Sequence, residues 1–198
     1  MLNEYGAIVE APADPRLKVS ECLSLFMVAF KLRGAGCCIH NHSVYANLIT
    51  AYHSRANQRR AATSAAWFAA EFRISNQEMI KGIKRGSTGH NLNYNDTLVV
   101  PIIDNVLYER DLAGAMHDIV LKYPDTNAVL VRNHGVYVWG GSWQQAKSMA
   151  ECYDYLFKLK LEAAKLDFDW LLDCGGGGAE AAGPGAHNGT AANGNGRP

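Results

Sequence analysis

Short runs of apolar, mostly β-branched residues alternate with helical segments along this chain. We expect strands at Cys37–His40, Phe68–Ile74, Leu98–Ile103, Ala128–Arg132 and Val136–Trp139. Between them we expect helices from Ser20 to about Leu32, from Ser43 to about Tyr52, over Asp111–Tyr123 and from Ser142 to about Lys165. Strands separated by helices predict a layered α/β domain.

Two segments depart from this alternation. Residues 53–66 are polar and rich in alanine and arginine, which predicts an inserted surface loop or a helical extension. From Cys174 to Pro198 the chain consists largely of glycine, alanine and asparagine. Such a segment buries too little apolar surface to offset the entropy of ordering it. We therefore predict a folded domain over residues 1–173 and a disordered tail over 174–198.

Charge and cysteine content exclude several classes of protein. The 19 basic residues are balanced by 19 acidic ones, whereas a nucleic-acid-binding domain is typically basic. Residues 1–15 contain Glu4, Glu10 and Asp14 and do not resemble a secretory signal. The five cysteines form no CxxC pair, so a disulfide framework is not expected. These features favour a cytoplasmic protein with reduced thiols that does not bind nucleic acid.

Three histidines are candidate metal ligands. His40 and His42 stand two residues apart at the end of a predicted strand, so both side chains project from one face. Zinc accepts imidazole nitrogen, and catalytic zinc has three protein ligands with a fourth position open. His134 could supply the third, because Gly135 after it would allow a sharp turn. By itself, the His-x-His spacing fits structural histidines as well as ligands.

A carboxylate near such a metal would serve as general acid or base. Glu78 lies in a mixed polar and apolar segment, Asn76–Gly82. The alternative is an ordinary surface glutamate paired with Lys81 or Lys84, the commoner outcome for such a residue.

Several segments resemble one family. Residues 34–43, Gly-Ala-Gly-Cys-Cys-Ile-His-Asn-His-Ser, are similar to the metal-binding segment of class II aldolases and their relatives. Four others resemble one branch of that family, the methylthioribulose-1-phosphate dehydratases: Gln77–Lys84, Leu98–Ile103, Ala128–Gly140 and Glu151–Phe157. Together the resemblance covers most of residues 18–160.

The resemblance implies a fold and a site. The fold would be a three-layer α/β/α sandwich around a mostly antiparallel sheet, lacking its first elements. His40, His42 and His134 would hold one zinc ion per subunit, and Glu78 would be the catalytic acid/base. Ser20 would contact the substrate phosphate.

It also implies an activity. The chain would remove water from 5-methylthioribulose 1-phosphate to give 2,3-diketo-5-methylthiopentyl 1-phosphate, in methionine salvage. Zinc would polarise the C2 carbonyl while Glu78 moves the C3 proton. Members of the family form homotetramers with active sites near subunit interfaces, and we expect the same here.

The chain departs from the family pattern in two respects. Family members carry an earlier glycine-rich Gly-Thr-Gly loop and a Ser-Gly turn that bind phosphate, and neither is present here. We expect a truncated gene model, a fragment or an inactive chain, with lower stability than a full-length relative. In addition, Asn76 stands where a histidine is common.

Two other functions remain open from the sequence. One is a different class II aldolase-type lyase that cleaves a sugar phosphate by retro-aldol chemistry. The other is an adducin-like interaction protein without catalysis. The missing phosphate loops argue for it, and the retained His40, His42, His134 and Glu78 argue against it.

Overall fold

A five-stranded sheet forms the centre of the molecule. The computed structural model describes residues 1–3, 5–61 and 71–168. The strands are β1 (Cys37–Asn41), β2 (Glu71–Ile74), β3 (Leu98–Ile103), β4 (Ala128–Val131) and β5 (Gly135–Gly140). They lie in the order β1-β5-β4-β3-β2. Strands β3 and β4 are parallel, and the other three neighbouring pairs are antiparallel, as expected for a mostly antiparallel sheet.

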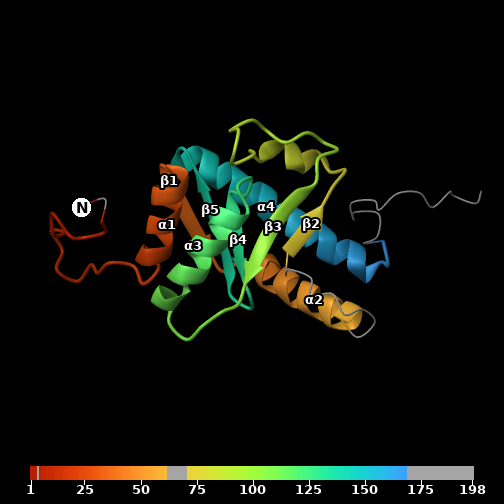
Figure 1. The fold of residues 1–198 in the computed structure, drawn as a ribbon, viewed down its shortest axis with the longest axis horizontal. Coiled ribbons are helices and arrows are strands. Elements are labelled where there is room, and N and C mark those ends of the chain that lie inside the picture. The colour runs from red at the N-terminus through yellow and green to blue at the C-terminus, as the bar shows by residue number, and fades with distance from the viewer. Residues whose placement is uncertain (4, 62–70, 169–198) are drawn as a thin grey trace, which may run out of the picture.

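Helices cover both faces of the sheet (Figure 1). One layer holds α1 (Leu23–Arg33) and α3 (Ala113–Lys122), and the other holds α2 (Val44–Ala61) and α4 (Trp143–Lys165). The strands have a period of two, so β5 sends Tyr137 and Trp139 into one core and Val136 and Val138 into the other. The predicted three-layer α/β/α arrangement is confirmed. No helix in the described ranges is long and apolar enough to cross a bilayer.

Of the three serines predicted to cap helices, two do so and one does not. Ser43 Oγ accepts the N–H groups of residues 45 and 46 at the start of α2, and Ser142 Oγ accepts that of Gln145 at the start of α4. The expected cap at Ser20 is wrong. Its Oγ accepts the N–H of Cys22 in a local turn, and α1 begins only at Leu23.

The segment that follows α2 was predicted in two ways. Helix α2 continues to Ala61, so the helical extension is confirmed over residues 53–61. Residues 62–70, including the predicted strand start at Phe68, lie outside the described residues, as does the tail over 174–198. Helix α3 begins two residues later than expected, because a 3-10 turn, η2 (Glu109–Leu112), precedes it.

The two ends of the sheet carry different elements. At the histidine end, β1, β3 and β4 finish and β5 begins. At the opposite end, which we call the η1 end, β2 leads into η1 (Glu78–Gly82) and β3 begins. Figure 1 shows η1 in yellow-green at the top and the start of α2, next to the histidine end, at the bottom. Six-residue β3 separates the ends by roughly 17 Å.

Candidate metal centre

Three histidines and one glutamate converge at the histidine end. One side-chain ligand atom from each of His40, His42, Glu109 and His134 lies within 4.8 Å of the others. The Nε2 atom of His42 is 2.9 Å from that of His40 and 3.0 Å from that of His134. Glu109 Oε1 lies 3.3 Å from His134 Nε2. This donor set is able to bind a metal ion.

Contacts with strand β5 fix the orientation of His40, which lies on β1. Its Nδ1–H donates to the carbonyl oxygen of Val136 on β5, at 3.1 Å. The carbonyl can only accept, so the ring proton is on Nδ1 and the Nε2 lone pair faces the cluster. The imidazole also stacks on the Tyr137 ring, with centroids 4.0 Å apart. Such contacts fix the tautomer and the direction of a metal ligand.

His134 is placed by a strained turn between β4 and β5. Asn133 before it has φ 52°, a left-handed conformation that asparagine tolerates better than most residues. The Asn133 N–H donates to Thr50 Oγ1 at 2.9 Å, and that fully buried hydroxyl donates to the Asn47 carbonyl. Gly135 was expected to make the turn, but its role differs. A Cβ there would collide with the Asn41 carbonyl of β1.

Glu109 is a member of the cluster that sequence reasoning missed. It begins η2 and accepts a hydrogen bond from the Cys22 thiol through Oε2. Burial raises the pKa of the Cys22 thiol, and the Glu109 carboxylate adds to the effect, so the thiol stays protonated. The available signal was a carboxylate six residues after the buried strand β3, which ends beside the histidines.

Burial also keeps the histidines in their metal-binding form. It lowers the pKa of His40 and of His134, and the neighbouring His42 lowers both further. Neutral imidazole is the form that coordinates a metal. These two rings are therefore prepared as ligands at neutral pH.

An open cavity of about 430 Å³ adjoins the cluster. Its volume falls in the range of sites for small ligands. The lining residues are mostly polar: His42, Asn47, Asn105, Val106, Leu107, Glu109, Asn133 and His134. A small polar molecule in this cavity would touch the cluster directly.

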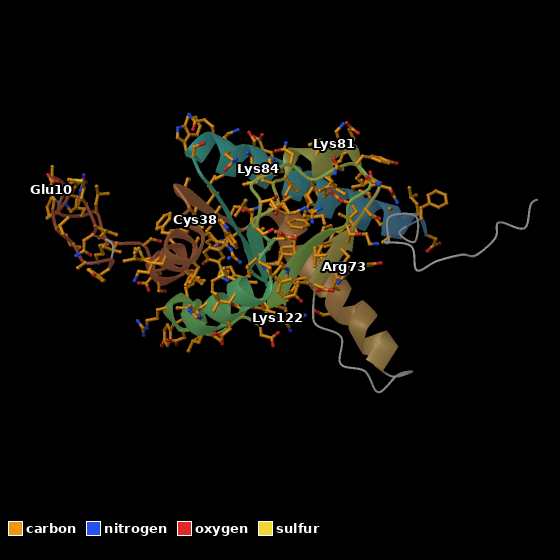
Figure 2. All side chains as sticks on the ribbon, turned by 45° about the horizontal axis from the view of Figure 1, so that its top comes forward. Glu10, Cys38, Arg73, Lys81, Lys84 and Lys122 are labelled. Carbon is orange, nitrogen blue, oxygen red and sulfur yellow. The ribbon has the colours of Figure 1, made fainter. Side chains whose placement is uncertain are left out.

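The two other predicted site residues are not members of the cluster. Glu78 is at the η1 end, where its side chain is 73% exposed and accepts a hydrogen bond from Lys81. Figure 2 shows Lys81 of η1 at the outer edge of the molecule. Ser20 is exposed and stands two residues before Cys22. The structure therefore does not bring Glu78 to the cluster of its own chain.

This chain matches one protein family. The family model described as "Class II Aldolase and Adducin N-terminal domain" matches residues 1–161. A "Probable methylthioribulose-1-phosphate dehydratase" of Leishmania braziliensis is 44% identical over 171 residues, covering 86% of this chain and 69% of that protein. The "Methylthioribulose-1-phosphate dehydratase" of Aquarana catesbeiana is 48% identical over 158 residues, covering 80% of this chain and 60% of that one. The chain thus spans about two thirds of the length of these relatives.

Solved structures support the fold. An aldolase II superfamily protein from Pseudomonas syringae superposes with a TM-score of 0.52 at 15% sequence identity. The match covers 87% of this chain and 56% of that one. At this identity, the likeness concerns the arrangement of helices and strands alone.

Proposed function

Because the chain belongs to the class II aldolase and adducin N-terminal domain family, we propose that it is a zinc-dependent dehydratase of 5-methylthioribulose 1-phosphate. The product would be 2,3-diketo-5-methylthiopentyl 1-phosphate, and the setting the methionine salvage pathway in the cytoplasm. Two of the relatives described above carry this activity in their names. The observation that carries the proposal is the convergence of three histidines and Glu109 beside an open cavity.

The donor set fits zinc. Zinc–nitrogen bonds of about 2.0–2.1 Å place two ligand nitrogens roughly 3.3 Å apart in a tetrahedral site. The Nε2 separations of 2.9 and 3.0 Å need only a small adjustment to reach that spacing. His40, His42 and His134 would hold the ion, with Glu109 beside them. When bound, zinc would polarise the C2 carbonyl of the substrate as a Lewis acid.

The reaction itself needs a group that moves a proton. Loss of water takes a proton from C3 and the hydroxyl from C4, and the resulting enol becomes the diketone. We propose Glu78 as this acid/base, as the family resemblance implies. Glu78 lies at the η1 end of its own chain, so it would have to reach the cavity of a second copy. The expected homotetramer would bring the two ends together.

Other residues would bind the substrate. The side chains of Asn47, Asn105 and Asn133 line the cavity and can hydrogen-bond sugar hydroxyls. Ser20 stays our proposed phosphate contact. It stands two residues before Cys22, whose thiol reaches Glu109.

The direct test combines metal analysis with product formation. We expect the purified chain to bind about one zinc ion per chain, as a three-histidine site requires, and to convert 5-methylthioribulose 1-phosphate to the diketone. His134→Ala should lose the metal and the activity together. His117→Ala is the matched control, because His117 is an exposed histidine on α3 paired with Asp118. It should keep both.

The same experiment separates the two alternatives. Aldol cleavage of a sugar phosphate without dehydration would replace the dehydratase by another lyase of the family. Zinc far below one ion per chain, unchanged by His134→Ala, would favour an adducin-like interaction protein.

A further inference from the structure

Three consecutive apolar residues lie exposed at the mouth of the metal cavity. Val106, Leu107 and Tyr108 are 44%, 84% and 51% exposed and follow one another in the loop between β3 and η2. Val106 and Leu107 line the cavity. Single exposed apolar residues are ordinary, but a run of three beside a ligand-sized cavity indicates a contact surface.

Both ends of this loop are held by the metal cluster. Before the apolar run, Asn105 Oδ1 lies 3.3 Å from Nδ1 of His134. After it, Glu109 Oε1 lies 3.3 Å from Nε2 of the same histidine. Val106 and Leu107 are therefore kept at a fixed place, next to the atoms where the reaction would occur.

The remaining lining of the cavity is polar. Asparagine, histidine and glutamate side chains form it, and among the described lining residues the apolar wall is Val106 with Leu107. The proposed substrate is polar along C1 to C4 and ends in an apolar methylthio group at C5. Apolar groups gain free energy by leaving water for an apolar contact. The polar part of the substrate thus matches the polar lining of the cavity, and the methylthio group matches its apolar wall.

We propose that Val106 and Leu107 contact the methylthio group and set the preference for it over a hydroxyl at C5. This inference rests on the proposed dehydratase function. It assigns substrate specificity to the same loop that carries Glu109. Binding of the methylthio group would cover part of the exposed Leu107 side chain.

The test compares two substrates that differ at C5, 5-methylthioribulose 1-phosphate and ribulose 1-phosphate. Leu107→Ala should lower kcat/KM for the methylthio compound about tenfold, the lower range for lost methylene contacts in an apolar pocket. It should change kcat/KM for ribulose 1-phosphate less than about twofold, because that substrate has no group for the apolar wall. Leu121→Ala is the matched control, since Leu121 is an exposed leucine on α3 outside the cavity lining.

Calorimetric Kd values of both sugar phosphates give a second measurement that needs no turnover. The unmodified chain should bind the methylthio compound more tightly, and Leu107→Ala should lose that preference. Absence of dehydration would count against the proposed function alone, because the Kd values still test the contact between Leu107 and the methylthio group. An equal loss for both compounds, an unchanged preference, or dissociation of the oligomer with the preference kept would overturn the inference.

Discussion

The histidine end and the η1 end of the sheet differ in how completely each is organised. At the histidine end, His40 and His134 are held by a backbone carbonyl, a stacked tyrosine and a buried threonine hydroxyl network. At the η1 end, Glu78 is mostly exposed, with a surface lysine as its partner. One chain thus brings the candidate metal ligands together by itself.

This difference is consistent with an active site that combines the histidine end of one copy with the η1 end of another. Hydrogen bonds to neighbouring groups orient metal ligands before the ion binds. An acid/base group needs only to reach the substrate in the assembled site. An exposed carboxylate far from its own metal centre can do so when a second copy brings it there.

The largest expected effect comes from replacing Glu78, and mixing two variants tests whether Glu78 acts in its own chain or in another copy. Glu78→Gln should keep the metal and lower kcat by about 10²–10⁴, the range for loss of a general acid/base. His42→Ala chains should lose the metal. When the two inactive variants are mixed and reassembled, about a quarter of the sites should combine an intact metal centre with an intact Glu78 in a symmetric assembly.

The control for this experiment is Glu162→Gln. Glu162 pairs with Lys165 at i+3 on α4, as Glu78 pairs with Lys81. It should retain full activity. If the mixed variants stay inactive while each still assembles, Glu78 does not act across copies.

Thr50→Val tests whether the Thr50 hydroxyl positions His134 at the histidine end. The variant removes the hydroxyl that accepts the Asn133 N–H and donates to Asn47. Metal affinity should fall by about tenfold, as for other groups that orient ligands. Stability should fall by about 1 kcal/mol, because the part-buried hydrogen bond from the Asn133 N–H is lost.

Thr50→Ser keeps the hydroxyl and should restore metal affinity. Zinc titration with a competing chelator measures the first effect, and thermal unfolding measures the second. A Thr50→Val chain with lower stability but unchanged affinity would mean that the threonine supports the fold without positioning His134.

The smallest expected effect concerns the loop that follows η1. Asp125 accepts hydrogen bonds from Ser87 and Arg85 in that loop, and the Ser87 bond is the main reason that its pKa is lowered. A lowered pKa contributes stability above the unfolded-state value and loses it as the pH falls through the folded-state value.

Asp125→Asn should therefore lower stability at pH 7 and make no difference at an acid pH below the folded-state pKa of Asp125. The carboxylate is half exposed, so solvent screening limits the effect to about 0.5 kcal/mol. Urea unfolding at both pH values measures it. An equal difference at both would show that the charge of Asp125 is not responsible.

Much of the fold was readable in short segments. Ser43 and Ser142 mark helix starts because capping is decided by residues within one turn. The alternation within Val136–Trp139 separates two cores because the strand period is two. The same local rules failed at Ser20, where a local turn displaced the helix start, and at the turn before His134, where Asn133 rather than Gly135 has positive φ.

The sequence by itself indicated that His40 and His42 project from one face, because they stand two residues apart where strand β1 ends. Only the tertiary structure decided that Glu109, Cys22 and Thr50 support that site and that Glu78 lies at the opposite end of the sheet. The physical reason is the range of the interactions. Spacing and capping act within a few residues, whereas strand order and helix packing join residues far apart in the chain.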